Sequence, residues 1–352
     1  MNILITGGLG FIGSTVIKKI INKIEGNVIN LDNLTYAANS NSLDFLSRNS
    51  NYVFYKGDIC DSKLVEEIFL KFEPTYLLNL AAESHVDRSI DYPEKFIKTN
   101  INGTFNLLEC SRKYWERFRK NKKGEFRFHH ISTDEVFGSL GETGLFDEHS
   151  KYNPSSPYSA SKASSDHLVR SWHRTYGLPT SISNCSNNYG PYQNPEKLIP
   201  RIILNAISGT SLPIYGNGMQ KRDWLFVEDH ADAIYEILIN GKEGETYNVG
   251  GNNEKTNLEI VEKICNVLDN LIITKPNGIK SFKELIKFVP DRPGHDYRYG
   301  INATKLKREL GWEAKTTIDS GIERTVKWYL DNLDVFKDYS NKIYNRKRLK
   351  EG

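Results

Sequence analysis

Residues 3–13 of this chain, ILITGGLGFIG, decide its fold, because an apolar strand runs directly into a glycine-rich turn that opens a helix. Gly7 permits the tight turn, and Gly10 lets the backbone approach a pyrophosphate. Gly13 lets helix and strand pack closely, while the N-terminus of the helix faces the phosphate charge. This order of strand, turn and helix predicts a dinucleotide-binding unit.

The second predicted strand ends at Asp32, nineteen residues after Gly13. A carboxylate there accepts hydrogen bonds from the ribose hydroxyls and repels a 2′-phosphate, so Asp32 favours NAD over NADP. A solvated loop aspartate is the competing explanation. The glycine spacing, with two residues between successive glycines, resembles that of the extended short-chain dehydrogenase/reductase family. This resemblance implies further NAD contacts from Phe11, Ile12, Asn33, Asp58, Ile59, Ala81, Ala82 and Thr99.

Short apolar runs alternate with amphipathic segments, which predicts a Rossmann-type doubly wound parallel sheet of the α/β class. The expected strands are 3–6, 28–31, 52–55, 76–80, 128–132 and 181–185, and the expected helices include 11–24, 62–72 and 93–118. Closely spaced turns after Tyr189 mark the start of a smaller substrate-binding domain. We therefore expect an NAD-binding domain over 1–188, a substrate domain over 189–340, and a return to the first domain at about 224–250.

The composition is that of a folded globular protein, with 38% hydrophobic and 26% charged residues. A net charge of +3, from 47 basic and 44 acidic residues, is too balanced for a nucleic-acid-binding surface. Only the tail from Lys342 to Lys350 is clearly basic, and we interpret it as a solvated end. The sequence has neither a signal peptide nor a run of ~20 apolar residues, which predicts a cytoplasmic protein without membrane contact. The four cysteines are widely separated, so no metal site is expected.

Tyr158 and Lys162 stand four residues apart at the start of a predicted helix, behind Pro154 and Pro157. This interval places the phenol and the ammonium on one helix face. A free tyrosine has a pKa of ~10, but the lysine and a positively charged nicotinamide both favour the phenolate. Tyr158 could then take a proton from a sugar hydroxyl while hydride leaves the same carbon for NAD. A structural tyrosine–lysine pair is the competing explanation.

The sharper signal is Thr133-Asp134-Glu135 at the end of the fifth predicted strand, the sheet edge that faces a ligand in this fold. A sugar epimerase of this family needs only a small hydroxyl residue here, so two adjacent carboxyls are more than it requires. Elimination of water needs both, because a carboxylate takes a carbon-bound proton while a protonated acid helps hydroxide leave. A helix-capping acidic pair is the alternative.

Several stretches, taken in order, resemble the dTDP-glucose 4,6-dehydratase family from Met1 to about Trp328. They are AESHVDRS at 82–89, STDE at 132–135, YGPYQ at 189–193, PEKLIP at 195–200, RDW at 222–224 and DRPGHD at 291–296. The resemblance implies that Thr133 hydrogen-bonds the sugar O4, Asp134 protonates the departing O6, and Glu135 is the base at C5. It also implies conversion of dTDP-glucose to dTDP-4-keto-6-deoxyglucose by oxidation at C4, loss of water across C5 and C6, and hydride return to C6.

The same resemblance places a set of residues around the sugar and diphosphate, with Tyr215 against the base. Guanidinium groups suit phosphate oxygens, although a surface salt bridge is the competing explanation for Arg222 or Arg292 taken singly. The stretch YGIN at 299–302 departs from the family, which commonly has alanine and aspartate around the isoleucine, so contacts after His295 are less well specified. A homodimer is implied by the family alone. The implied substrate contacts are Ser84, Thr133, Asn187, Lys197, Leu198, Pro213, Tyr215, Arg222, Asn257, Arg292 and His295.

Three alternatives stay open on the sequence. A nucleotide-sugar 4-epimerase shares the fold, the cofactor and the Tyr158–Lys162 pair, but it does not need Asp134 and Glu135. A 4,6-dehydratase acting on UDP- or CDP-glucose would use the same chemistry, because the sequence does not determine the base. A non-catalytic NAD-sensing protein could keep the glycine turn and Asp32, but it would have no use for the active-site tyrosine.

Overall fold

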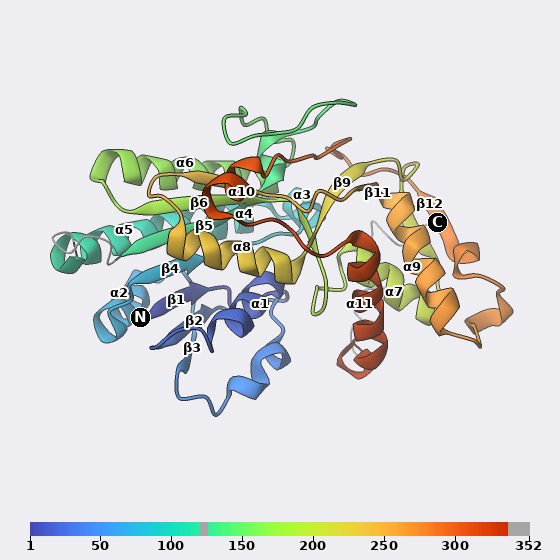
Figure 1. Cartoon of the computed structure of the whole chain (residues 1–352), viewed down its shortest axis with the longest axis horizontal. Coiled ribbons are helices and arrows are strands. Elements are labelled where there is room, and N and C mark those ends of the chain that lie inside the picture. The colour runs from blue at the N-terminus through green and yellow to red at the C-terminus, as the bar shows by residue number, and fades with distance from the viewer. Residues whose placement is uncertain (120–125, 337–352) are drawn as a thin grey trace.

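A computed structural model describes residues 1–119 and 126–336, so the basic tail at 342–350 and the end of the expected substrate domain lie outside the described residues. Seven parallel strands form the central sheet in the order β10-β6-β5-β4-β1-β2-β3 (Figure 1). Their bounds are β1 (Ile3–Thr6), β2 (Val28–Asp32), β3 (Tyr52–Lys56), β4 (Tyr76–Asn79), β5 (Arg127–Thr133), β6 (Thr180–Cys185) and β10 (Thr246–Val249). The chain winds outward in both directions from β1, which confirms the doubly wound parallel sheet predicted from the sequence.

Helices cover both faces of this sheet, because successive strand side chains point to opposite sides. Leu4 and Ile29 pack with α2 and α5, whereas Ile3, Ile5 and Val28 pack with α1 and α8. The main helices of these layers are α1 (Phe11–Ile20), α2 (Ser62–Phe72), α5 (Thr104–Tyr114), α6 (Pro157–Tyr176) and α8 (Val227–Asn240). Within the described residues, none of the helices offers the length of apolar surface that a bilayer crossing requires.

The sheet has its topological switch point between β1 and β4, which pair in parallel. The connections after these two strands leave toward opposite faces, and this divergence opens a crevice at the carboxyl edge of the sheet. Gly7 follows β1 there and Ala81 follows β4, and both line the same cavity. The fold therefore places the glycine-rich turn at the edge where ligands bind in this architecture.

A second core lies beyond β6 in the chain, on the right of Figure 1. Buried Ile202, Ile264 and Val326 meet there, on three different helices. Its elements are β7 (Asn187–Tyr189), α7 (Leu198–Ile207), β8 (Leu212–Tyr215), β9 (Lys221–Phe226), β11 (Glu254–Thr256), α9 (Asn257–Leu271), β12 (Ile286–Val289) and α11 (Ile318–Asp331). The short helices α3 (Val86–Asp91) and α4 (Pro93–Phe96) pack against α6 instead, and α10 (Thr304–Leu310) packs against β10. Between β9 and β11 the chain returns to the large sheet, where β10 adds an edge strand and α8 joins the helices that cover one face.

The helix expected over 93–118 is present, because the run from Pro93 to Arg119 is helical throughout, but it is not α-helical along its whole length. After α4 the chain forms a wide π-helical turn over Ile97–Gly103, and a second one follows α5. Asn100 explains the first, because its amide nitrogen donates to the Glu83 carbonyl oxygen at 3.0 Å and its amide oxygen accepts from the Glu83 N–H at 2.9 Å. The same amide nitrogen donates to Ser161 at 2.8 Å. These contacts select a register that the apolar periodicity does not encode.

Candidate active site

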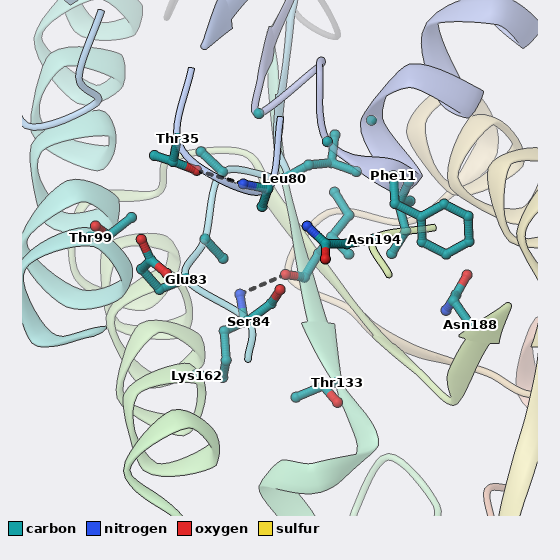
Figure 2. Close-up of a pocket in the computed structure, with 18 of the residues that line it drawn as sticks. Phe11, Thr35, Leu80, Glu83, Ser84, Thr99, Thr133, Lys162, Asn188 and Asn194 are labelled. Atoms are coloured by element: carbon teal, nitrogen blue, oxygen red, sulfur yellow. Dashed lines mark hydrogen bonds between the residues drawn. The ribbon is translucent and has the colours of Figure 1, made fainter. Parts of the chain in front are cut away.

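Two neighbouring cavities lie at the carboxyl edge of the large sheet, and three residues line both of them: Glu135, Asn187 and Lys197. The volumes of the two cavities are about 290 Å³ and about 180 Å³. Figure 2 shows the larger one, with Phe11 of α1 and Lys162 of α6 on its wall. The arrangement suits two ligands that meet where the cavities join.

Every residue expected to contact NAD lines the larger cavity. These residues are Gly7, Gly10, Phe11, Ile12, Gly13, Asp32, Asn33, Asp58, Ile59, Ala81, Ala82, Thr99, Tyr158 and Lys162. Sequence reasoning missed further lining residues, among them Thr35, Ala38, Leu80 and Asn194 outside the quoted motifs, Glu83 within the stretch at 82–89 and Asn188 on β7. Within residues 1–119 and 126–336, no cluster of three or more His, Cys, Asp or Glu side chains is arranged to hold a metal ion.

The glycine turn forms a cradle that side chains would fill. Gly7 has a φ of +70°, and a Cβ there would stand 2.7 Å from the backbone of Ala81. A Cβ on Gly13 would stand 2.3 Å from the Gly7 carbonyl oxygen. No side chain caps the start of α1, so its first N–H groups remain available to a ligand. The cradle thus fits the pyrophosphate of a dinucleotide.

The Asp32 carboxylate is fixed by the two loops beside it. One oxygen accepts from the Leu9 N–H at 2.9 Å and the other from the Leu34 N–H at 2.8 Å. Burial raises the pKa of Asp32, and these two hydrogen bonds oppose that shift. The side chain therefore lines the cavity in a fixed orientation, as an acceptor for ribose hydroxyls requires.

Thr133, Asp134 and Glu135 leave β5 in one turn of 3₁₀-helix, and the Thr133 hydroxyl accepts from the Glu135 N–H at 3.3 Å. Asp134 is buried, and its Oδ2 has no hydrogen-bond partner in the described part of the chain. Burial and then Glu135 raise the pKa of Asp134 well above its ordinary value. The capping explanation therefore fails for the carboxyls, because the threonine side chain is the cap.

Glu135 is half-buried between the two cavities and has different neighbours. Burial raises its pKa, but Arg292, Lys197 and Arg222 all act in the opposite direction. Asp134 has a net excess of negative neighbours, since Glu135 and Asp223 outweigh Arg222 in their effect on its pKa. The two carboxyls are therefore suited to opposite protonation states, with the proton on Asp134.

Tyr158 and Lys162 both lie on the buried face of α6, whose first turn is fixed by a reciprocal Ser156–Ser159 cap. The Lys162 ammonium donates to the Ile131 carbonyl oxygen at 2.8 Å and lies 3.2 Å from Nε2 of His130. Burial and then Glu135 raise the pKa of Tyr158 well above its ordinary value. Without the charged nicotinamide ring, burial and Glu135 set the direction of the phenol pKa, so the lowered value expected from the sequence stays a prediction for the enzyme with NAD bound.

The residues expected to contact the substrate all line one cavity or the other. Ser84 and Thr133 line the larger one, and Asn187 and Lys197 line both. The remaining ones line the smaller cavity and are Leu198, Pro213, Tyr215, Arg222, Asn257, Arg292 and His295. Sequence reasoning missed His85, Asp87, Glu196, Arg201 and Trp224 on the same wall, although most of them belong to the motif stretches at 82–89, 195–200 and 222–224.

The two arginines of the smaller cavity are held differently. Arg222 is 4% exposed, donates to the Asp296 carbonyl oxygen at 2.9 Å, and lies over the Tyr299 ring with 4.3 Å to its centroid. A surface salt bridge is therefore wrong for Arg222. Arg292 does form an ion pair, at 3.5 Å from Asp87, but its Nε is buried without a hydrogen-bond partner among the described residues. Both guanidinium groups place positive charge beside Glu135.

The chain is similar to known proteins over nearly its whole length. Residues 4–325 match the family described as GDP-mannose 4,6 dehydratase. A dTDP-glucose 4,6-dehydratase of Escherichia coli is 56% identical over 99% of both chains. The solved dTDP-glucose 4,6-dehydratase of Bacillus anthracis, in complex with NAD, is 44% identical with a TM-score of 0.83, covering 95% of this chain and 98% of that one.

A second solved structure, dTDP-glucose 4,6-dehydratase from Streptomyces venezuelae with NAD and dTDP bound, is 39% identical with a TM-score of 0.87. It covers 96% of this chain and 99% of that chain. These similarities extend over both cores and both cavities rather than over the NAD-binding half alone. The chain therefore belongs to the dTDP-glucose 4,6-dehydratase family.

Proposed function

We propose that this chain is an NAD-dependent hydro-lyase that converts dTDP-glucose to dTDP-4-keto-6-deoxyglucose. The observation that carries the proposal is the carboxyl pair Asp134 and Glu135, which both line the larger cavity, with Glu135 also lining the smaller one. A 4-epimerase of this fold has no step that uses a pair of carboxyls in opposite protonation states. The 56% identity to a dTDP-glucose 4,6-dehydratase over nearly the whole chain supports the same conclusion.

In the oxidation step, Tyr158 takes the proton of the C4 hydroxyl while Thr133 hydrogen-bonds the same oxygen. Both side chains line the larger cavity. NAD, when bound, supplies the acceptor for the C4 hydride and later returns that hydride to C6. Because burial raises the pKa of Tyr158, its proton transfer depends on positive charge from Lys162 and from the oxidised nicotinamide ring.

In the elimination step, the new ketone at C4 makes the C5 proton acidic, and Glu135 takes it. Asp134 donates its proton to the C6 hydroxyl, which leaves as water. The carbon–carbon double bond formed between C5 and C6 accepts the hydride at C6, and Glu135 returns its proton to C5. The three cations around Glu135 favour the ionised base, and the buried position of Asp134 favours the protonated acid.

We also propose the division into an NAD-binding domain over 1–188, a substrate domain over 189–340 and a return at about 224–250, supported by the two cores and by β10.

A homodimer is supported by exposed aromatic rings on neighbouring helices, Phe105 on α5 and Tyr176 on α6. A cytoplasmic location is supported by the four unpaired cysteines, which suit a reducing compartment.

The test is turnover with purified protein and a panel of dTDP-, UDP-, CDP- and GDP-glucose in the presence of NAD. We expect the 4-keto-6-deoxy product from dTDP-glucose at a higher kcat/KM than from the other three. Interconversion of glucose and galactose nucleotides without a 6-deoxy product would instead identify an epimerase. Preference for UDP- or CDP-glucose would keep the reaction and correct the base.

A further inference from the structure

A row of four side chains follows one face of α6, starting at the reactive end of the helix. Tyr158, Lys162, Asp166 and Arg170 are spaced four residues apart, so they succeed one another along that face. The first two line the larger cavity, whereas Asp166 is 0% exposed and lines neither cavity. A fully buried carboxylate is costly unless it is hydrogen-bonded and paired with a cation, so its presence behind the active site calls for an explanation.

One oxygen of Asp166 is saturated by donors. Its Oδ2 accepts from the Ser132 hydroxyl at 2.8 Å, the Tyr152 hydroxyl at 2.8 Å and the Asn184 amide nitrogen at 3.3 Å. Three donors on a single oxygen suit the ionised carboxylate, which only accepts. Arg170 supports it indirectly, because the guanidinium donates to the Tyr152 hydroxyl at 2.7 Å.

The other oxygen lies beside His130, which in turn contacts the lysine of the active site. Oδ1 of Asp166 has no hydrogen-bond partner among the described residues and lies 3.5 Å from Nε2 of His130. That same nitrogen lies 3.2 Å from the Lys162 ammonium. The amide nitrogen of Asn79 lies 3.1 Å from Nδ1 of His130, so the ring is held between Asn79 on one side and Asp166 and Lys162 on the other. Carboxylate, imidazole and ammonium are thus packed in one buried cluster.

Asp166 is the counter-charge in this cluster. His130 is neutral, because burial lowers its pKa well below the ordinary value. Cys185, which faces Lys162 from β6, is a neutral thiol because burial raises its pKa. Tyr158 precedes the lysine on α6, and burial raises the pKa of its phenol well above the ordinary value until the positive charge of the oxidised nicotinamide ring acts on it. Among the groups that face the ammonium in the described residues, Asp166 is the one that holds a stabilising negative charge.

We propose that Asp166 is a positioning residue for the oxidation step, whose carboxylate keeps the buried Lys162 protonated and in place behind Tyr158. This inference rests on the function proposed above. Burial lowers the pKa of Lys162 to about 8, and Asp166 acts in the opposite direction. The ammonium, and the oxidation that depends on it, is present below that pKa and lost as the pH rises through it. Removing the Asp166 charge therefore moves the loss to lower pH.

The experiment is single-turnover formation of NADH from dTDP-glucose across a pH series, with the wild type and Asp166→Asn. Loss of a neighbouring opposite charge typically shifts a pKa by ~1–3 units, so we expect the basic limb of the variant to fall at least about one pH unit lower. At pH values below both limbs the two rates should converge, and above the wild-type limb they should differ by about tenfold or more.

Two further variants separate a charge effect from packing. Asp229→Asn removes another buried carboxylate, on α8, which accepts from the Thr316 N–H at 2.8 Å, and it should leave the limb in place. Asp166→Glu retains the negative charge, so the basic limb of its pH profile should stay at the wild-type pH even if the rate is lower. If Asp166→Asn does not fold, the pH profile of Asp166→Glu is the measurement that tests the proposal. An unshifted limb in Asp166→Asn, an equal loss at every pH, or a shifted limb in Asp166→Glu would overturn the proposal. Absence of hydride transfer in the wild type would instead count against the proposed function itself.

Discussion

Glu135 differs from Asp134 in its charged neighbours, and this difference predicts what each substitution does. A base is needed at C5 for elimination but not for hydride transfer at C4. Glu135→Gln keeps the shape of the side chain and removes the proton acceptor, so it should still reduce NAD in single turnover. We expect a 4-keto-glucose nucleotide to accumulate and the 6-deoxy product to form ~10²–10⁴-fold more slowly. Product analysis by mass spectrometry after a quench measures both species.

Solvent deuterium provides the matched control for this variant, because the wild-type product should carry solvent hydrogen at C5 whenever the base exchanges before returning its proton. If Glu135→Gln forms the 6-deoxy product at nearly the wild-type rate and with the same C5 label, another group is the base. Asp134→Asn serves as a comparison, since it should also stop elimination while leaving the C5 proton exchangeable.

Asp32 carries a second prediction at this scale, on cofactor choice. Its carboxylate is fixed by the Leu9 and Leu34 N–H groups and faces the cavity. Hydrogen bonds to a charged group contribute ~1.5–3 kcal/mol, so Asp32→Asn should weaken NAD binding about ten- to a hundredfold. NADP should be affected less, because the same change removes repulsion of the 2′-phosphate. Titration of apo-protein with both cofactors tests this, and equal wild-type affinity for NAD and NADP would contradict the role of Asp32.

At the scale of secondary-structure elements, the sequence predicted the strands better than the helices. The strand over 3–6 and the helix over 62–72 have the expected bounds, because apolar patterning and turn residues define them locally. The helical run over 93–118 is also present, but the sequence does not predict its π-helical turns, since Asn100 bonds to Glu83 and Ser161, which are distant in sequence. The charged neighbours of Glu135 were not predicted either, because they are also distant from it in sequence. Lys197 and Arg292 come to Glu135 from the part of the chain that follows β6.

The approach of α1 to the glycine turn gives a prediction at this scale. Alanine normally favours a helix over glycine by ~1 kcal/mol. At Gly13, however, a Cβ would stand 2.3 Å from the Gly7 carbonyl oxygen, and overpacking of this kind costs ~1–3 kcal/mol. Gly13→Ala should therefore lower the thermal midpoint and weaken NAD binding. Gly141→Ala is the control, because a Cβ at that glycine meets nothing within 4 Å. Equal stability of the two variants would contradict the close-packing argument.

At the scale of the whole molecule, the two cavities meet at Glu135, Asn187 and Lys197, so the sugar and the nicotinamide ring are expected to share one site throughout turnover. A hydride taken from C4 then has no reason to leave with the cofactor before it is returned to C6. Retention of the hydride requires the NAD-binding core and the second core to hold the cofactor and the sugar side by side. No single motif in the sequence encodes this joint arrangement of the two cores. The consequence is a reaction in which NADH never accumulates in proportion to product.

An isotope experiment tests that consequence directly. With dTDP-glucose deuterated at C4, we expect the deuterium at C6 of the same product molecule, even when unlabelled free NADH is present in excess. Mixing C4-deuterated substrate with substrate labelled by ¹³C in the sugar distinguishes transfer within one molecule from transfer between molecules. Because the cofactor is regenerated in place, product carrying both labels should be absent. Deuterium loss to the free NADH pool, or its appearance in the ¹³C-labelled product, would mean that the cofactor exchanges during turnover and that the two cavities act independently.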